Sequence, residues 1–573
     1  MINKELIEIL NNVANAYEIK GVEWKPIAYR TAANSIENLN HNITKLYEKK
    51  GINALKKLPG VGESIAKHLE EYILNGKVKE FEELFKQIPL SQSLLMKIEG
   101  LGPKKIKELQ EELKISNIKD LKEAIEQDKI KELERFGQKT QDNIKKSIQR
   151  YEKVSERMLI SEAMPIAEEI IEKLKAKSPI DKIIYAGSLR RQKETIGDID
   201  ILAFSKEPQK VIDVFTNMDD ISDIISKGKS KSTIILKNNI QIDLRLIDKK
   251  SFGAAMQYFT GSKEHNIELR KIAQKKGYKL SEYGLYNKKN KKIAGEKEED
   301  IYNKLKMQWI PPELRENKGE IETAKKNQIP KLIKLKDIKG DLHIHSKLTD
   351  GNNTIKEIVD ATQEKGYEYI AISDHSKSAI IASGLSKNEL KKEIKEIDKL
   401  QKNSQMKILK SSEIDILEDG SLDYDDDTLQ KLDIKICSIH KKFKLSKKDM
   451  TNRILNAINN ENLDILGHPL CRIIGKRAEI EFDSKKIYKE IAKNNKCLEI
   501  NSNPKRLDLN DINIKFAKEC GAKFVINTDT HNISNLNFIK YGISQARRGW
   551  LTKNDVINTL PYKDFIKHFK NKK

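Results

Sequence analysis

The 573-residue sequence is poor in the features that mark disulfide-rich and membrane proteins. It has only four cysteines, and no two of them form a Cys-x-x-Cys pair, which argues against a disulfide scaffold and a zinc ribbon. No uninterrupted apolar run approaches the roughly 18 residues that a membrane span needs. The first ten residues predict an amphipathic helix and lack a signal-peptide core. We therefore expect a soluble cytoplasmic protein with about four domains of ~150 residues.

An excess of positive charge is the clearest feature of the composition. Lysine and arginine together number 108 against 86 aspartates and glutamates, which gives a formal net charge of +22. Such a balance favours a polyanionic partner, above all nucleic acid. Compositional drift is the alternative, because lysine far outnumbers arginine and both asparagine and isoleucine are abundant. Charge alone gives nucleic acid a modest lead, so the local motifs must decide.

Hydrophobic patterning divides the chain into a helical part and a strand-rich part. Residues 1–150 carry apolar residues at helical spacing, whereas short apolar strands separated by turns and helices begin near residue 155. The polar segment 316–338, in which Pro330 interrupts any long helix, predicts a linker. After it, strands alternate with helices seven times, which predicts a parallel sheet closed into a barrel. The expected fold class is multidomain α and α/β.

Three segments of the helical part share a helix, a tight glycine turn and a second helix: 58–62, 98–102 and 133–137. Glycine lets the backbone approach a phosphate, and the free N–H groups that begin the second helix bind its oxygens without reading base sequence. Ordinary helix C-caps are the alternative. Repetition in a basic chain favours phosphate binding, although Arg135 weakens the third copy by replacing its first glycine. The glycines expected to contact DNA are Gly60, Gly62, Gly100, Gly102 and Gly137.

Paired carboxylates follow in the strand-rich part. Asp198 and Asp200 are two residues apart on a predicted strand, so their side chains share a face at a distance of roughly 7 Å. Asp243 lies on a later strand and could be a third ligand. Three carboxylates suit Mg²⁺, and two such ions can activate a 3′ hydroxyl and stabilise a leaving pyrophosphate. Surface acids on edge strands are the alternative.

Candidate phosphate ligands stand just before these acids. Gly187 and Ser188 follow a strand and would offer backbone and hydroxyl donors to a triphosphate, which Arg191 would neutralise. Together with the three aspartates and the segment YFTGS at 258–262, these residues resemble the DNA polymerases of the X family. The resemblance implies that Asp198 and Asp200 bind both metal ions. It also implies that Asp243 binds the catalytic ion and accepts the primer-hydroxyl proton.

The same resemblance implies a nucleotide pocket. Tyr258 and Phe259 would line the sugar site and hinder a 2′-OH, whereas Asn266 and Arg270 would face the nascent pair and the template. Taken alone, the two aromatic residues would be assigned to an apolar core. The residues expected to contact the nucleotide are Gly187, Ser188, Arg191, Gly197, Tyr258, Phe259, Gly261, Asn266 and Arg270.

The X-family resemblance extends to the N-terminus, where 26–30 and the first hairpin are similar to its small DNA-end-binding domain. In members with 5′-deoxyribose-phosphate lyase activity, a lysine forms a Schiff base where this chain has His68. Imidazole cannot form that imine. Lys67 is adjacent but faces about 100° around the helix. We therefore expect no efficient lyase activity.

Histidines gather at the strand ends of the last region. Six of the ten follow predicted strands after residue 340, and strand C-termini converge on one face of a barrel. His343 and His345 share one side of a strand, and carboxylates lie in the same segments. A lone histidine would more often be structural. Six of them with carboxylates predict a site for Zn²⁺, Mn²⁺ or iron rather than Ca²⁺.

This region resembles the polymerase and histidinol phosphatase (PHP) domain, with its motifs in order. The resemblance implies a cluster of two or three metal ions, Mn²⁺ or Zn²⁺, that hydrolyses phosphoesters, and His440 is counted among the catalytic residues. Asp374, beside His375, resembles a residue that orients a ligand. The nine expected metal ligands are His343, His345, Asp350, His375, Glu413, His440, His468, Asp529 and His531.

These observations predict a repair DNA polymerase that fills short gaps and carries a metal-dependent 3′–5′ exonuclease, with AP endonuclease or 3′-phosphatase activity as further options. Its partners would be gapped or nicked double-stranded DNA and dNTPs, with Mg²⁺ at the polymerase site, and the protein would be a monomer. The expected domains are a DNA-end-binding domain at 1–80, a second helical subdomain at 81–154, a nucleotidyltransferase palm at 155–248, a thumb at 249–315, a linker at 316–338 and a PHP barrel at 339–573.

Three alternatives stay open at this point. The polymerase half could be an inactive DNA-binding scaffold that carries an active PHP phosphoesterase. Both metal sites could be structural, in a non-catalytic end-joining scaffold. The C-terminal half alone could also be a sugar-phosphate or histidinol-phosphate hydrolase, although such an enzyme has no need of the DNA-binding hairpins.

Overall fold

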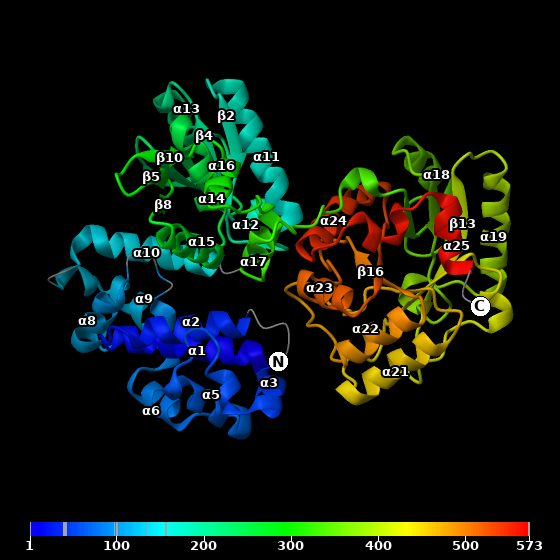
Figure 1. The fold of residues 1–573 in the computed structure, drawn as a ribbon, viewed down its shortest axis with the longest axis horizontal. Coiled ribbons are helices and arrows are strands. Elements are labelled where there is room, and N and C mark those ends of the chain that lie inside the picture. Colours follow the sequence, from blue (N-terminus) through cyan, green and yellow to red (C-terminus); the bar gives the residue numbers. More distant parts are fainter. Residues whose placement is uncertain are drawn as a thin grey trace. The chain divides into compact units, whose positions relative to one another are not determined.

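The computed structural model describes residues 2–37, 43–96, 98, 101–133, 136–154 and 157–570. The chain divides into two compact units (Figure 1). The first comprises residues 1–157 with the turn 237–239, and the second comprises 158–236 and 240–573. No helix among the described residues has an apolar stretch long enough to cross a membrane.

The first unit consists of helices around one apolar core. Helix α1 shows the pattern that builds it, because Leu6, Leu10 and Val13 recur at helical spacing and are fully buried. Of the predicted glycine turns, Gly62, Gly102 and Gly137 lie at the starts of helices, whereas residues 99, 100, 134 and 135 are outside the described part of the chain. The elements are α1 (Ile2–Ile19), α2 (Lys25–Glu37), α3 (Ile43–Lys50), α4 (Ile52–Leu55), α5 (Glu63–Asn75), α6 (Lys79–Gln87), α7 (Leu90–Leu95), α8 (Pro103–Leu113), α9 (Ile118–Glu126), the 3-10 turn η1 (Ile130–Glu132) and α10 (Gly137–Val154).

The second unit begins with the palm, a five-stranded mixed sheet in the order β2-β4-β7-β6-β5. Strands β4 and β7 are parallel neighbours, and their register places Asp200 opposite Asp243. Strands β1 and β3 pair with each other as a separate two-stranded antiparallel ribbon. The elements are β1 (Met158–Leu159), α11 (Ile160–Lys177), β2 (Lys182–Tyr185), α12 (Gly187–Arg190), β3 (Thr195–Ile196), β4 (Asp198–Phe204), α13 (Pro208–Thr216), β5 (Ile221–Lys227), β6 (Lys231–Leu236) and β7 (Gln241–Leu246).

The thumb follows as helices and a small antiparallel sheet in the order β10-β9-β8. Its core includes Leu269, Leu285 and Ile301. Its elements are η2 (Lys249–Ser251), α14 (Phe252–Thr260), α15 (Lys263–Lys275), β8 (Lys279–Ser281), β9 (Gly284–Tyr286), β10 (Lys292–Ala294), α16 (Glu298–Lys304) and η3 (Pro312–Leu314).

The segment 316–338 differs from the linker that its polar composition predicts. It forms α17 (Glu320–Lys325) and η4 (Leu335–Asp337), and Ile321 is part of the thumb core. Glu320 is fully buried, where its carboxylate lies 2.7 Å from His265 Nδ1 and accepts the backbone N–H groups of residues 317 and 318. These partners satisfy a polar side chain that the sequence alone places at the surface.

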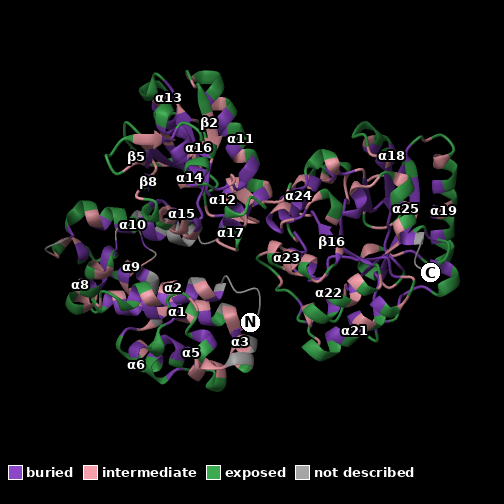
Figure 2. Cartoon of the chain, in the orientation of Figure 1, coloured by how far each residue is buried: buried purple, intermediate pink, exposed green. Residues whose placement is uncertain are grey.

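The last region is a barrel of seven parallel strands, in sequence order from β11 to β17. An isolated bridge between Ile344 and Thr530 joins its first and last strand segments, so the predicted barrel is confirmed. Figure 2 shows buried residues on its strands and exposed ones on the outer helices. The strands are β11 (Gly340–Ile344), β12 (Tyr369–Ile372), β13 (Lys407–Asp415), β14 (Ile434–Ser438), β15 (Ile465–Leu466), β16 (Cys497–Asn501) and β17 (Lys523–Asn527).

Helices and short turns connect these strands, and each helix follows a strand as in other barrels of this type. The palm core continues into this region, because Leu507 and Tyr541 belong to the same apolar cluster as the palm strands. The connecting elements are α18 (Ile355–Glu364), η5 (Ile380–Ala382), α19 (Lys387–Gln401), α20 (Asp426–Leu429), α21 (Lys447–Asn459), α22 (Ser484–Lys493), α23 (Asp511–Glu519), η6 (Ile533–Phe538), α24 (Ile539–Arg548), η7 (Lys553–Asp555), η8 (Ile557–Thr559) and α25 (Tyr562–Lys570).

Candidate active sites

The palm sheet brings the three predicted aspartates to one edge. Asp198 and Asp200 alternate on β4, and Asp243 lies beside Asp200 on β7. Asp243 is buried, accepts a hydrogen bond of 2.6 Å from Thr233 Oγ1, and lies 3.1 Å from Lys231 Nζ. Asp198 is exposed at the start of its strand. The strand pairing thus groups acids that are more than 40 residues apart in the sequence.

Mutual repulsion among these carboxylates marks a place for a cation. Burial, together with the nearby charges of Asp198 and Asp243, raises the pKa of Asp200 to about 7 against the weaker opposing effect of Arg245. A divalent cation would relieve this repulsion, so the three residues fit a metal site.

Gly187 makes room for the Asp200 carboxylate. Its backbone is left-handed, with φ of +57°, and a Cβ atom there would lie 2.4 Å from Asp200 Oδ2. Only glycine accommodates both the conformation and the contact. Ser188 follows within α12 and is partly exposed, as is Gly197 immediately before Asp198. The predicted phosphate-binding turn is therefore directly against a predicted metal ligand.

Arg191, the residue expected to neutralise a triphosphate, is engaged by other groups in this structure. Its Nε donates to Glu316 Oε1 at 3.1 Å, and its Nη1 donates to the carbonyl of Thr260. The neighbouring Arg190 is tied to Glu298 by two hydrogen bonds of 2.9 and 3.0 Å. Contact between Arg191 and a triphosphate would therefore require its terminal nitrogens to leave the Thr260 carbonyl or share it.

The predicted nucleotide pocket residues are partly linked to one another. Tyr258 and Phe259 pack edge to face with ring centroids 5.1 Å apart, and Asn266 Nδ2 donates to the Tyr258 carbonyl at 2.7 Å. Arg270 lies one turn beyond Asn266 on α15 and is partly exposed. A Cβ at Gly261, where φ is +71°, would lie 3.2 Å from a terminal nitrogen of Arg191. The structure thus brings Gly261 against the predicted triphosphate arginine.

The helical unit presents open helix starts at its glycine turns. Gly62 and Gly102 are the N-cap residues of α5 and α8, and neither provides a side-chain cap. No atom of the described residues lies within 4 Å of a Cβ built on either glycine. Gly137 begins α10 and is equally open. Gly60 differs, because a Cβ there would lie 2.6 Å from Thr31, so the close packing of this turn requires glycine. Gly100 lies outside the described residues.

His68 has a structural environment. It is buried, its Nδ1 lies 3.0 Å from the Tyr29 hydroxyl, and its Nε2 lies 3.0 Å from Glu80 Oε2. Lys67 points to the surface, with its ammonium 3.9 Å from Glu63. Both nitrogens of His68 therefore have partners, and neither residue is placed as a buried amine nucleophile would be.

Glu413 lies at the centre of the histidines of the barrel. Its two carboxylate oxygens lie 2.8 Å from His468 Nε2, 3.1 Å from His375 Nδ1 and 3.2 Å from His440 Nε2. His343 Nε2 is 3.3 Å away. One buried carboxylate therefore faces imidazoles from four separate strand ends. This convergence is the one that barrel topology predicts for strand C-termini.

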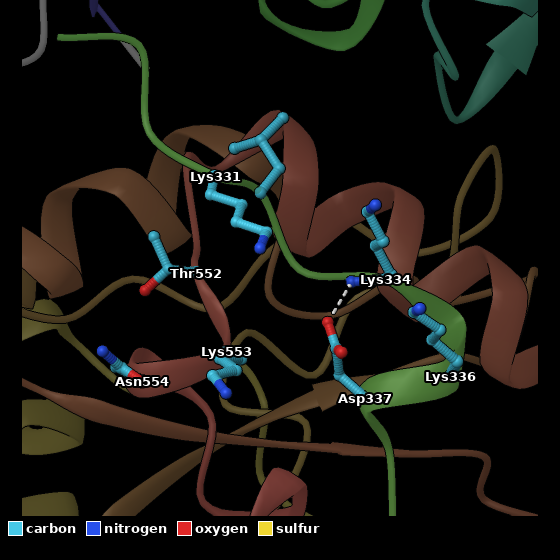
Figure 3. A pocket seen from close by; sticks show the side chains of 8 residues that line it. Lys331, Lys334, Lys336, Asp337, Thr552, Lys553 and Asn554 are labelled. Atoms are coloured by element: carbon cyan, nitrogen blue, oxygen red, sulfur yellow. Dashed lines mark hydrogen bonds between the residues drawn. The ribbon is translucent and has the colours of Figure 1, made fainter.

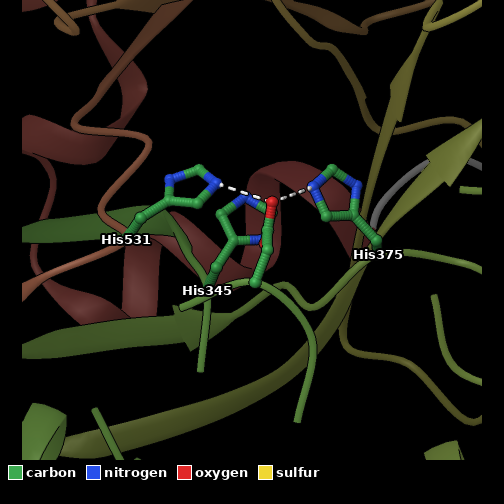
Figure 4. A group of neighbouring side chains, drawn as sticks. His345, His375 and His531 are labelled. Carbon is green, nitrogen blue, oxygen red and sulfur yellow. Dashed lines mark ion pairs between the residues drawn. The ribbon is translucent and has the colours of Figure 1, made fainter. Parts of the chain in front are cut away.

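A second carboxylate, Asp350, gathers the remaining histidines. Its Oδ2 lies 3.2 Å from His531 Nε2 and 3.6 Å from His375 Nε2, and His345 is adjacent (Figure 4). Asp529 completes the cluster through Oδ1, which is 3.3 Å from His345 Nε2. Three overlapping groups have ligand atoms within 4.8 Å: His345, Asp350, His375 and His531; His343, His345 and Asp529; and His375, Glu413 and His440.

Buried nitrogens that make no hydrogen bond indicate that this cluster fits metal ions. Among the described residues, these are His343 Nε2, both nitrogens of His345, His375 Nδ1 and His468 Nδ1, and three of them lie only at ion-pair distance from Glu413 or Asp529. Buried polar atoms without partners are rare in folded proteins. Imidazole and carboxylate groups that point at one another in this way match the donor set of transition-metal sites. The nine ligands predicted from the sequence are therefore brought together.

Three supporting residues of this cluster were not predicted from the sequence. Glu499 on β16 lies 2.7 Å from His343 Nδ1 and accepts the backbone N–H of His468. Asp415 on β13 is bonded to His440 Nδ1, so His440 presents Nε2 to Glu413. Arg506 lies 3.6 Å from Asp529. A carboxylate inside an otherwise apolar strand, as in CLEIN, is the signal that could have identified Glu499.

Asp374, which the sequence suggested would orient a metal ligand, binds the loop that follows His345. Its carboxylate accepts the backbone N–H of Ser346 at 2.7 Å and the hydroxyls of Ser346 and Thr349. It therefore anchors the loop that carries Asp350.

A separate cavity of about 390 Å³ lies against η4 and η7 (Figure 3). Four lysines line it, and its one carboxylate, that of Asp337, accepts the backbone N–H of Lys334 at 2.8 Å. None of its lining residues is a predicted site residue. The cavity is positively charged and belongs to neither catalytic centre. Its lining is Lys331, Leu332, Lys334, Lys336, Asp337, Thr552, Lys553 and Asn554.

Known families match several parts of the chain. Residues 1–78 match the helix-hairpin-helix domain, and 52–114 and 92–150 match the SAM-like helix-hairpin-helix tandem. Residues 255–316 match the DNA polymerase beta thumb, and 341–503 match the PHP domain. The hairpin, thumb and PHP resemblances noted in the sequence are thus confirmed.

One relative matches over nearly the whole length. The chain is 38% identical over 569 residues to "DNA polymerase/3′-5′ exonuclease PolX" of Bacillus subtilis (strain 168), which covers 98% of both proteins. The chain belongs to the X family of DNA polymerases. More distant X-family relatives are the proteins named DNA polymerase lambda of Rattus norvegicus, 23% identical over 303 residues (49% of each chain), and of Arabidopsis thaliana, 24% identical over 348 residues (55% of this chain and 62% of the relative).

Proposed function

We propose that this X-family chain is a DNA polymerase that also degrades DNA as a 3′–5′ exonuclease. The observation that carries the proposal is the presence of two separate acidic centres in one chain, one on the palm and one in the PHP barrel. The three palm carboxylates suit nucleotide transfer and the histidine–carboxylate cluster of the barrel suits phosphodiester hydrolysis. The relative that matches over nearly the full length has both activities in its name. Short gaps and nicks in double-stranded DNA are the proposed substrates, and DNA repair is the proposed role.

At the palm, Asp198, Asp200 and Asp243 are the proposed Mg²⁺ ligands. Bound Mg²⁺ would supply the positive charge that activates a 3′ hydroxyl and stabilises a leaving pyrophosphate. Asp243 is the proposed acceptor of the hydroxyl proton, because it is buried and held by Thr233. The turn at Gly187 and Ser188 offers donors for the triphosphate next to Asp200.

At the barrel, the nine clustered ligands are proposed to hold two or three ions of Mn²⁺ or Zn²⁺. These ions would supply the charge that binds phosphate oxygens and activates water. The Asp415 partner fixes which nitrogen of His440 faces the site, so His440 is held in one orientation. The same ligand set would serve hydrolysis of an abasic-site phosphodiester or of a 3′-phosphate monoester, because both reactions break the P–O bond to a 3′ oxygen.

The open glycine turns of the helical unit support binding to DNA without sequence preference. Their free N–H groups and the net charge of +22 fit contacts to backbone phosphates. We propose that the protein acts as a monomer and has no efficient lyase activity, since His68 occupies the lysine position. Raising salt from low to physiological concentration should weaken gap binding sharply, and a flat dependence of the Kd would contradict phosphate-dominated binding.

Incorporation of one nucleotide into a one-nucleotide gap tests the polymerase assignment. Asp243→Ala should lower Mg²⁺-dependent incorporation by about a thousandfold or more, since two-metal catalysis depends on this ligand. Asp219→Ala, which removes an exposed acid of the palm, is the matched control and should retain wild-type rates. Equal rates in the two variants would leave the palm as a platform that only holds DNA.

A further inference from the structure

Residues of the PHP barrel hold the palm segment that connects Ser188 to Asp198. Arg472 forms a two-pronged ion pair with Glu194, with hydrogen bonds of 2.6 and 3.3 Å. Ser544 on α24 donates to the side chain of Gln192 at 2.8 Å. Arg548, at the end of the same helix, donates to the backbone carbonyl of Arg191 at 2.7 Å. The segment between the predicted triphosphate and metal ligands is thus fastened to the other catalytic domain.

Arg548 has the most enclosed position of these barrel residues. Its side chain is 3% exposed, and besides the Arg191 carbonyl it binds Glu316 at 3.1 Å and Asp511 at 2.6 Å. Burial by itself would raise the pKa of Glu316, but Arg548, Arg191 and Lys193 lower it to about 2. The carboxylate is therefore ionised at neutral pH and depends on cations for its stability in a buried place.

Arg191 and Arg548 meet at a single atom. Oxygen Oε1 of Glu316 accepts from Arg191 Nε and from Arg548 Nη1, each at 3.1 Å. Arg548 neutralises much of the charge on this carboxylate. Glu316 can therefore orient the Arg191 guanidinium through Nε without depending on Arg191 as its only strong partner. Without Arg548, the largely buried charge of Glu316 would be left with Arg191 and the more exposed Lys193, 3.7 Å away, and would compete with a triphosphate for Arg191.

We propose that Arg548 of the PHP barrel is a positioning residue for nucleotide incorporation, which keeps the Arg191 guanidinium available to the incoming triphosphate by sharing Glu316 with it. The inference rests on the proposed function of Arg191 as a triphosphate ligand. It adds that the nuclease barrel contributes to nucleotide binding by the polymerase. The effect reaches the triphosphate through Glu316 and the Arg191 carbonyl, so Arg548 itself need not touch the nucleotide.

Steady-state gap filling by the full-length protein tests this role. Arg548→Ala should raise KM for the dNTP about tenfold, the effect of losing one hydrogen bond to a charged group, and should change kcat by less than about threefold. Arg547→Ala is the matched control. Arg547 is the adjacent barrel arginine, and its contacts are with Glu313 at 2.7 Å and the carbonyl of Ile333 at 2.8 Å. Its KM should stay within twofold of wild type.

A second substitution distinguishes positioning from a merely structural role. In the Arg548→Ala background, Glu316→Gln removes the uncompensated charge and should return KM toward the wild-type value. If Arg548 only held the domains together, the second change would leave KM where it was or raise it further. Exonuclease activity on the same DNA should remain within about twofold in every variant, which shows that the barrel is folded and that the defect lies in nucleotide binding.

Arg191→Ala separates this inference from the assignment on which it rests. A raised KM in Arg191→Ala together with a wild-type KM in Arg548→Ala would overturn the inference and leave the proposed function of Arg191 in place. An unchanged KM in Arg191→Ala would overturn both. Equal increases in Arg547→Ala and Arg548→Ala, or failure of Glu316→Gln to restore KM, would also overturn the positioning role.

Discussion

The substitution Gly187→Ala tests how the palm holds the Asp200 carboxylate, a proposed metal ligand. A Cβ at this position would lie 2.4 Å from Asp200 Oδ2, whereas non-bonded carbon and oxygen atoms need about 3.4 Å. The carboxylate must therefore move by roughly 1 Å, and a misplacement of this size at a reacting centre costs about a hundredfold in rate. The left-handed backbone, with φ of +57°, adds about 1–2 kcal/mol of strain for a residue with a side chain.

The assay is single-turnover insertion into a one-nucleotide gap at saturating dNTP, with exonuclease activity measured on the same preparation. Gly366→Ala is the matched control, because its φ is +76° and no atom lies within 4 Å of a Cβ built there. It adds comparable backbone strain without a clash. We expect insertion to fall about a hundredfold in Gly187→Ala only, while the exonuclease persists in both.

Insertion by Gly187→Ala within about threefold of wild type would refute the reasoning. It would mean that the Asp200 carboxylate has room to adapt, or that it is not a ligand whose position matters. A parallel loss of insertion in Gly366→Ala would point instead to strain and general instability.

Three further results are expected. Glu413→Gln, which removes the carboxylate at the centre of the histidine cluster, should lower exonuclease activity at least a hundredfold and spare gap filling, and an active nuclease on a sequencing gel would contradict its central role. Because the pKa of Asp200 is about 7, a proton competes with Mg²⁺ for this carboxylate as the pH falls below 7. The Mg²⁺ concentration for half-maximal insertion should therefore rise about tenfold per pH unit, and a flat profile between pH 5.5 and 7 would contradict this. Glu298→Ala should lower the free energy of unfolding by about 3–5 kcal/mol, because Arg315 and Arg190 lose their buried partner. Against the effect of burial, these arginines lower the pKa of Glu298, so its ion pairs stabilise the fold fully above about pH 4.3 and less as the carboxylate becomes protonated at lower pH. An unchanged denaturant midpoint at pH 7 would contradict this prediction.

The barrel and the gathering of its histidines and carboxylates could be predicted because their signals are local. Each strand is a short apolar run between polar segments, and histidines or carboxylates follow it at the same end. Even β15, with only two paired residues, is followed by His468. The topology of parallel strands then brings these ends together, which requires no knowledge of packing.

Other parts of the fold depend on partners distant in the sequence. Strand β5 (Ile221–Lys227) alternates partly buried and exposed residues at the edge of the palm sheet, so it has no apolar run that would predict a strand. The segment 316–338 is polar, yet two of its acids, Glu316 and Glu320, are largely or fully buried against arginine and histidine side chains of other elements. Similarly, the sequence predicts that Arg191 is available to bind a triphosphate. Its ion pair with Glu316 could not be predicted, because the two residues are brought together only by the fold.

The central claim is that one chain holds two independent catalytic sites. Its most direct test uses a 5′-labelled primer in a one-nucleotide gap with Mn²⁺, with and without dNTPs, resolved on a gel for wild type, Asp243→Ala and His440→Ala. The account predicts that Asp243→Ala loses extension but still shortens the primer, and that His440→Ala loses shortening but still extends it. Shortening without any extension in the wild type, or joint loss of both activities in either variant, would contradict it.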